Sequence, residues 1–203
     1  AHDVRFYLAV AYHELGDMKA AEQELRRIPA ASDRYEDARI NLGQLLYETE
    51  RPEEAAAAVE SLLEVDNNNA RGLRYLIELY EVMANYPKAL EYAQRLVQSD
   101  PGNDEYLYRL AWVYEKGGER DQAITVLRKV LEMNPDNGPA LNFLGYTFAE
   151  RGENLDEAEQ LIKMEGASLA QKLKGIVAKA RDQLARAQAE IDRVFVAEHT
   201  ERA

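Results

Sequence analysis

The chain has 203 residues and a formal net charge of −12, from 25 basic and 37 acidic side chains. Such an acidic excess argues against a sequence-independent grip on nucleic acid or anionic lipid, because both need Lys and Arg to displace counterions. The lack of cysteine excludes disulfides and thiol nucleophiles. No apolar run approaches the roughly 20 residues of a membrane-spanning helix, so we expect no direct membrane insertion.

A 34-residue period begins with the first residues of the chain. In each unit a leucine is followed by a residue that is small in four of the five units and, three positions later, by a large apolar or aromatic residue. The leucines are Leu8, Leu42, Leu76, Leu110 and Leu144. A second small residue follows at Ala21, Ala55, Ala89, Ala123 and, shifted by one position, Ala158. Residues at these spacings share a helix face, so the pattern predicts helices that approach closely at their small residues.

Between the two small positions of every unit lies a predicted helix break. The breaks are Gly16-Asp17, Glu50-Arg51-Pro52, Asn85-Tyr86-Pro87, Gly117-Gly118 and Gly152. Glycine suits the left-handed turn at a helix end, and proline suits the first turn of the next helix. Each unit is therefore predicted to be two antiparallel helices of about 12 to 14 residues. Pro29 is expected to end the second helix of the first unit early.

This pattern resembles the tetratricopeptide repeat, and the run from Leu144 to Ala158 is similar to bacterial members. The resemblance implies an all-α fold, a right-handed α-solenoid of five helix-turn-helix repeats. The repeats are predicted at residues 2–35, 36–69, 70–103, 104–137 and 138–165, as a domain over 1–165. Because a full first helix opens at Asp3 without a polar cap, we expect the array to belong to a longer one. The sequence does not decide the compartment: the bacterial cytoplasm and the periplasm are both compatible with it.

The segment 166–203 is predicted to be a capping or interaction helix, because the repeat pattern stops at Met164. One long helix from Leu169 to about Ala197 carries apolar residues at alternating steps of three and four, which is a heptad seam. The seam residues are Leu173, Val177, Ala180, Leu184, Ala187, Ile191 and Val194. Two interpretations stay open: the helix caps the last repeat, or it packs into a second copy through Leu173, Val177, Leu184, Ile191 and Val194, giving a homodimer.

The resemblance implies that the first helices of successive units line a concave, peptide-binding groove. The side chains that helix phase places there are Phe6, Val10, Ile40, Gln44, Tyr47, Arg71, Arg74, Tyr108, Trp112, Lys116, Asn142 and Tyr146. Trp112 is the only tryptophan and is expected to be an anchor for a bound segment, the alternative being that it packs between helices. Arg71 and Arg74 are expected to meet a carboxylate of the ligand.

Three patterns imitate catalytic or metal sites. The run His13-Glu14-Leu15-Gly16-Asp17 lacks the second histidine of a zinc protease, and the turns at Asp66 and Asp136 lack the ligand spacing of a calcium loop. We expect no metal, no cofactor and no enzyme activity. The predicted function is a non-catalytic adaptor or scaffold that binds a protein segment, basic or amphipathic in character, in its groove. The alternative is a scaffold that assembles through its C-terminal helix.

Overall fold

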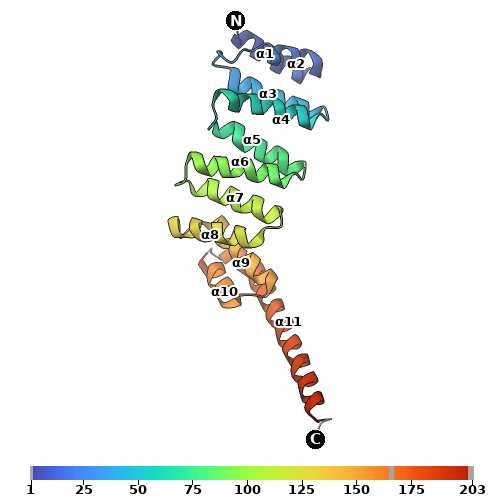
Figure 1. The fold of residues 1–203 in the computed structure, drawn as a ribbon, viewed down its shortest axis with the longest axis vertical. Coiled ribbons are helices and arrows are strands. Elements are labelled where there is room, and N and C mark those ends of the chain that lie inside the picture. The colour runs from blue at the N-terminus through green and yellow to red at the C-terminus, as the bar shows by residue number, and fades with distance from the viewer. Residues whose placement is uncertain (1, 165–166, 201–203) are drawn as a thin grey trace. The chain divides into compact units, whose positions relative to one another are not determined.

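The computed structural model describes residues 2–164 and 167–200, and in the last helix the side chains of residues 174–190 and 193. Over these residues it contains eleven α-helices and no strand, which confirms the predicted all-α fold (Figure 1). The helices are α1 (His2–Glu14), α2 (Met18–Arg26), α3 (Tyr35–Glu48), α4 (Pro52–Val65), α5 (Ala70–Val82), α6 (Tyr86–Ser99), α7 (Asp104–Lys116), α8 (Arg120–Met133), α9 (Gly138–Arg151), α10 (Leu155–Met164) and α11 (Ala167–Thr200).

The chain forms two compact units, residues 1–123 and residues 124–203. In the first unit α1 packs on α2, α3 on α4 and α5 on α6, and each second helix also packs on the first helix of the next pair. The helices therefore succeed one another as stacked hairpins, as Figure 1 shows for α1 to α7. The predicted domain boundary at residue 165 falls between the end of α10 and the start of α11.

The small residues of the repeat lie where the helices touch. The second-helix alanines, from Ala21 to Ala158, are all at most 1 % exposed. At Gly43 an added Cβ would lie 2.7 Å from Val59 Cγ2 and 3.1 Å from Tyr75 Cε1, so α4 and α5 both approach α3 at this point. The repeat leucines are buried except Leu8 on α1, which is 40 % exposed.

The turn inside each hairpin has a left-handed residue at the same place. The residues are Gly16, Glu50, Ala84, Gly118 and Gly152, at 34-residue intervals, with φ between 55° and 83°. The turn between hairpins is fixed by a helix cap: Asn69, Asn103 and Asn137, also 34 residues apart, accept a hydrogen bond from a backbone N–H at the start of α5, α7 and α9. The turns at Asp66 and Asp136 therefore lead into helix caps at Asn69 and Asn137.

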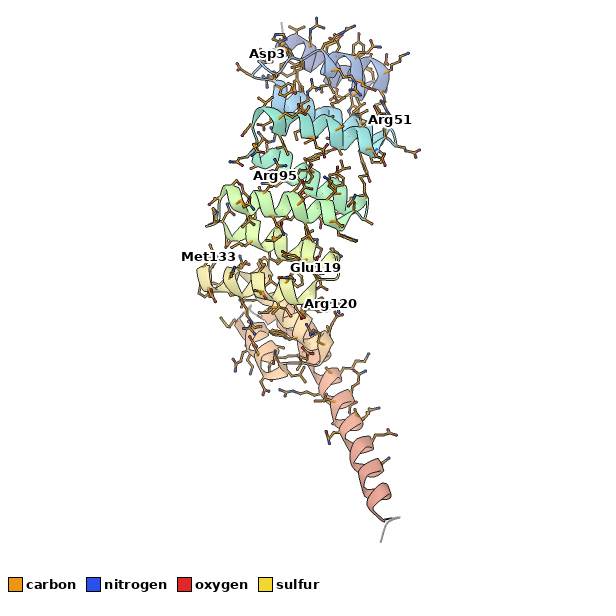
Figure 2. All side chains as sticks on the ribbon, in the orientation of Figure 1. Asp3, Arg51, Arg95, Glu119, Arg120 and Met133 are labelled. Carbon is orange, nitrogen blue, oxygen red and sulfur yellow. The ribbon has the colours of Figure 1, made fainter. Side chains whose placement is uncertain are left out.

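Ion pairs join neighbouring hairpins of the first unit. Arg51, labelled in Figure 2, lies between α3 and α4 and places Nη1 2.7 Å from Glu22 Oε2 on α2. Arg71 on α5 reaches back to α3, where its Nη1 is 2.6 Å from Glu36 Oε1 and 2.9 Å from Asp37 Oδ1.

As predicted, α2 ends before Pro29, after nine residues.

In the second unit, α9 and α10 form a hairpin on which α11 packs. Val177 is 5 % exposed, and Arg181 Nη2 lies 2.7 Å from Asp156 Oδ1 on α10. Residues 181–190 are all exposed, including Leu184 at 58 %. The prediction of one long helix is confirmed. Among the predicted seam residues, the side chains of Leu173, Ile191 and Val194 lie outside the described ones.

No helix in the described part of the chain is long and apolar enough to cross a membrane.

Candidate binding surface on α3, α5 and α7

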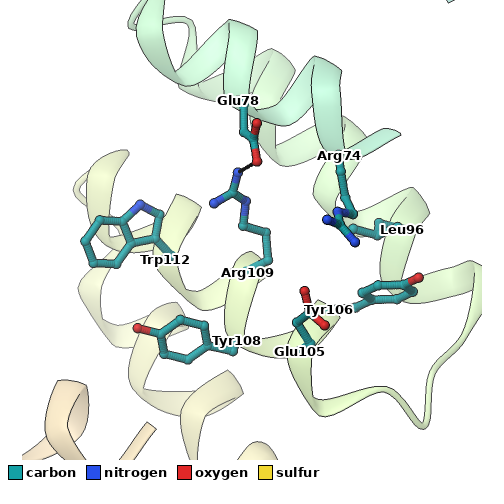
Figure 3. Close-up of a pocket in the computed structure, with 8 residues that line it drawn as sticks. All are labelled: Arg74, Glu78, Leu96, Glu105, Tyr106, Tyr108, Arg109 and Trp112. Carbon is teal, nitrogen blue, oxygen red and sulfur yellow. Dashed lines mark hydrogen bonds and ion pairs between the residues drawn. The ribbon is translucent and has the colours of Figure 1, made fainter. Parts of the chain in front are cut away.

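Three adjoining pockets lie on one face of α3, α5 and α7, which we call the groove face. The Trp112 pocket, of about 400 Å³, is lined by Arg74, Glu78, Leu96, Glu105, Tyr106, Tyr108, Arg109 and Trp112 (Figure 3). The Lys116 pocket, of about 440 Å³, is lined by Glu78, Glu81, Val82, Tyr86, Arg109, Trp112 and Lys116. The Tyr47–Tyr75 pocket, of about 170 Å³, is lined by Gln44, Tyr47, Tyr75, Glu78, Leu79 and Val82. Glu78 belongs to all three, so the pockets form one continuous surface.

Trp112 is held at the centre of this surface by charged side chains. The Lys116 Nζ lies 4.7 Å from the centre of the indole ring, a cation–π arrangement. Glu81 on α5 also interacts with the Trp112 side chain. Burial raises the pKa of the Glu81 carboxyl above its usual value, against the lowering effect of the nearby Arg109 guanidinium. The half-buried ring thus has a fixed orientation, with part of its face open to the pockets.

Arg109 links α7 to α5 beside the tryptophan. Its Nη2 lies 2.7 Å from Glu78 Oε1 and 3.5 Å from Glu81 Oε2. Figure 3 shows the guanidinium between Trp112 and the Glu78 carboxylate. The Glu78 side chain is 63 % exposed, whereas that of Glu81 is 15 % exposed. The surface therefore combines aromatic rings with a partly neutralised pair of carboxylates, a composition suited to binding a polypeptide.

Comparison with protein families matches this chain in three places. Family models described as tetratricopeptide repeat match residues 3–27, 40–104 and 83–142. The chain belongs to the tetratricopeptide repeat family. As a member, it has an α-solenoid fold and is a protein-interaction scaffold. Members of this family are in general non-catalytic interaction modules.

Solved structures agree on the fold. A tetratricopeptide repeat protein from Parabacteroides merdae ATCC 43184 has a TM-score of 0.69 at 23 % identity, over 96 % of this chain and 79 % of that one. A MamA protein has a TM-score of 0.62 at 20 % identity, over 88 % of this chain and 94 % of that one. MamA 41-end from Desulfovibrio magneticus RS-1 gives 0.61 at 15 % identity, over 80 % and 92 %. No curated protein matches the sequence.

The predicted groove residues of this tetratricopeptide repeat protein are only partly gathered on the groove face. Six of them line its three pockets: Gln44, Tyr47, Arg74, Tyr108, Trp112 and Lys116. Val10 lines a separate pocket of about 110 Å³ between α1 and α3, which also includes Gln44 and His13. Phe6 instead packs beneath the guanidinium of Arg34, 5.6 Å from the ring centre, and Ile40 is half-buried. Asn142 and Tyr146 lie on α9 in the second unit, where the Tyr146 hydroxyl donates to Glu150 Oε1.

The two arginines expected to meet a ligand carboxylate differ in the structure. Arg71 is held by Asp37 and Glu36, whose hydrogen bonds raise the pKa of its guanidinium, so its charge is already compensated within the chain. Arg74 is exposed, lines the Trp112 pocket and forms no ion pair within the described residues (Figure 3). Among the two, Arg74 is the one open to a partner.

Sequence reasoning missed Arg109, Glu105 and Tyr106, which complete the Trp112 pocket. The available signal was Arg109, which stands three residues before Trp112 and so on the same side of a helix. The histidine of the protease-like run pairs with Glu48 instead, with 2.6 Å between His13 Nε2 and Glu48 Oε2. Among the described residues no group of three or more His, Asp or Glu side chains could hold a metal ion.

Proposed function

We propose that this protein is a non-catalytic adaptor that binds a peptide or helix of a partner protein along the groove face. The observation that carries the proposal is the continuity of three pockets around Glu78, with Trp112 between two of them. A polypeptide can place successive side chains in adjoining pockets, whereas a small ligand would occupy one. Half-buried aromatic residues beside charged groups are the usual anchors of protein interfaces.

Charge favours a segment that is basic or amphipathic. The net charge of −12 would attract such a segment over a distance of about 8 Å at physiological salt. Arg74 adds a place for one acidic group of the ligand, because it lines the Trp112 pocket and forms no ion pair with any other residue that the structure describes. The ligand would therefore carry apolar side chains for the rings, basic side chains for Glu78 and one carboxylate near Arg74.

The experiment is a peptide selection followed by a titration. Peptides of 12 residues from a random displayed library are selected on the full chain, synthesised and titrated into wild type and Trp112→Ala by calorimetry. We expect Trp112→Ala to weaken binding about tenfold or more, since truncating an interface anchor costs at least about 2 kcal/mol. Tyr7→Ala is the control, because Tyr7 is 59 % exposed on α1 and lines none of the three pockets. Equal affinities for wild type and Trp112→Ala would refute the proposal.

A second candidate function is self-assembly through α11, favoured by the exposure of Leu184 in the middle of the heptad seam. Sedimentation of the full chain over a range of concentrations tests it. If α11 pairs with α11 of a second copy, Leu184→Gln should weaken the dimer about tenfold or more, because it removes a buried apolar contact at the seam. Ala185→Gln, one residue off the seam and also exposed, should leave the dimer intact. A wild-type chain that stays monomeric removes this candidate.

A further inference from the structure

The Tyr47–Tyr75 pocket has a construction unlike its two neighbours. Its lining includes two tyrosines from adjacent hairpins, Tyr47 on α3 and Tyr75 on α5, together with the apolar side chains of Leu79 and Val82. Tyr47 is 42 % exposed and Val82 is 66 % exposed, so the apolar surface is open to a ligand. The only charged residue in the lining is Glu78.

Gly43 allows the Tyr75 ring to lie close against α3. The Tyr75 ring lies so close to α3 that a Cβ on Gly43 would be 3.1 Å from Cε1 and 3.2 Å from Cζ. Tyr47 stands four residues after Gly43, one helical turn further along the same side of α3. The Tyr75 ring is thus positioned by the close packing of α3 and α5, and Tyr47 lines the same pocket from the same side of α3.

Two carboxylates flank the rings. Burial is the largest cause that raises the pKa of Tyr75, which reaches about 12. The negative charges of Glu48 and Glu78 act on its hydroxyl in the same direction. Glu48 is held in place by His13 and by the amide of Gln44. Glu78 uses Oε1 for Arg109, and within the described residues its Oε2 has no hydrogen-bond partner. The pocket therefore offers an open acceptor beside two aromatic faces.

We propose that this pocket binds an arginine side chain of the segment held on the groove face, an inference that rests on the proposed function. The planar guanidinium stacks on tyrosine faces through cation–π attraction and donates N–H groups to Glu78 Oε2. Its methylene stem packs against Leu79 and Val82. A carboxylate would be repelled by Glu48 and Glu78, and a purely apolar side chain would desolvate Glu78 without a hydrogen bond in return.

The test uses small probes in place of a peptide. Nα-acetyl-L-arginine methylamide and its neutral isostere Nα-acetyl-L-citrulline methylamide are titrated into the full chain, and the tyrosine ring signals are followed by NMR. The resonances of Tyr47 and Tyr75 are assigned from single Tyr→Phe variants. We expect arginine to shift these two rings and to bind about tenfold more tightly than citrulline, because citrulline keeps the shape and loses the charge.

Single substitutions identify which side chain causes the preference for arginine over citrulline. Glu78→Gln should remove most of the preference for arginine over citrulline, and Tyr47→Leu should weaken both probes. Glu64→Gln is the matched control, since Glu64 is an exposed carboxylate on α4 that lines none of the pockets. Three results would each overturn the proposal: equal affinity for the two probes, NMR shifts in other tyrosine rings without shifts in Tyr47 and Tyr75, or no binding of either probe.

The outcomes separate this inference from the proposed function. The adaptor proposal depends on selected peptides and on Trp112, whereas the arginine pocket depends on an amino-acid amide and on Glu78. If selected peptides bind through Trp112 while citrulline equals arginine, only the arginine inference fails. If the arginine probe shifts Tyr47 and Tyr75 as expected while no peptide depends on Trp112, the adaptor proposal fails and the pocket chemistry stands.

Discussion

At the scale of single residues, the position with a left-handed backbone inside each hairpin is occupied by glycine in some repeats and by a residue with a Cβ in others. Glycine occupies it in Gly16, Gly118 and Gly152, where a positive φ has no steric cost, but Glu50 and Ala84 adopt it with a Cβ. A left-handed L-residue costs roughly 1–2 kcal/mol. The helix break predicted at Asn85-Tyr86-Pro87 lies where α5 ends and α6 begins. The residue with the left-handed backbone is Ala84, just before this run.

We expect Ala84→Gly to stabilise the protein by about 0.5–1 kcal/mol, because the relief of strain exceeds the added entropy of the unfolded chain. Urea unfolding followed by circular dichroism measures the change. Ala57→Gly, at an exposed position within α4, is the opposite case and should destabilise by about 1 kcal/mol. If both substitutions destabilise equally, the left-handed strain at residue 84 is absent.

Trp112 gives a spectroscopic view of one titrating residue. Because burial raises the pKa of Glu81, its protonation should change Trp112 fluorescence with a midpoint above the usual value of 4.5. Glu81→Gln should abolish the transition. Glu78→Gln should keep it but move it to lower pH, since the charge of Glu78 is one of the causes that raise the pKa of Glu81. A transition that persists in Glu81→Gln would assign the fluorescence change to another group.

At the scale of helices, a shared acceptor ties α4, α5 and α6 together. The hydroxyls of Tyr80 and Tyr92 both donate to Glu60 Oε1, at 3.0 Å and 2.6 Å, and their rings stack with centres 5.7 Å apart. Burial, then the hydrogen bond to Glu60, raises the pKa of Tyr80 to about 12, so the phenol stays a donor at neutral pH. One carboxylate thus satisfies two tyrosines that are at most 9 % exposed.

We expect Glu60→Ala to destabilise the protein by about 2–3 kcal/mol, because it leaves two buried hydroxyls without their acceptor. Glu60→Gln should cost about 1 kcal/mol, since its amide oxygen can still accept. Glu64→Ala, one turn further along α4 and exposed, should change stability by less than about 0.5 kcal/mol. Chemical denaturation of the three variants checks the order, and a Glu60→Ala variant as stable as Glu64→Ala would contradict it.

The helices were predictable because their signals are local and repeated. Leu42, Gly43 and Ala55 mark buried positions at spacings that the 34-residue period repeats. The groove face was less predictable, because it depends on which side chains meet across hairpins. Arg71 and Arg74 look equivalent in sequence, yet Arg71 is held by Glu36 and Asp37 from the preceding first helix. Such a pairing depends on the rotamers of residues about one repeat apart, for which helix phase alone gives no information.

At the scale of the whole molecule, the acidic chain is stabilised by arginines that connect one hairpin to the next. The hydrogen bond from Arg51, followed by that from Arg26, holds the pKa of Glu22 below its usual 4.5. A carboxyl with a lowered folded-state pKa contributes stability above its unfolded pKa and loses it as the pH falls through the folded value. The repeat array should therefore lose stability in acid at its connections between hairpins.

We expect the thermal midpoint of the wild type to fall between about pH 5 and pH 3, and Arg51→Gln to be less stable at pH 7 but to show a smaller fall. Lys88→Gln, which removes an exposed ion pair within α6, is the control and should follow the wild-type pH profile. Differential scanning calorimetry across this range provides the measurement. Parallel curves for wild type and Arg51→Gln would show that the Arg51–Glu22 pair does not link stability to pH.

Glu78 lies on all three pockets of the groove face and shares Arg109 with Glu81. A ligand cation on Glu78 Oε2 shares this carboxylate with Arg109 on Oε1 and weakens the attraction between Arg109 and Glu78, so the guanidinium can move closer to Glu81 beside Trp112. Occupation of one pocket would thus alter the affinity of its neighbour through an exchange of ion-pair partners. Thermodynamic reciprocity requires the effect to be equal in both directions, so the two ends of a bound segment would report on each other.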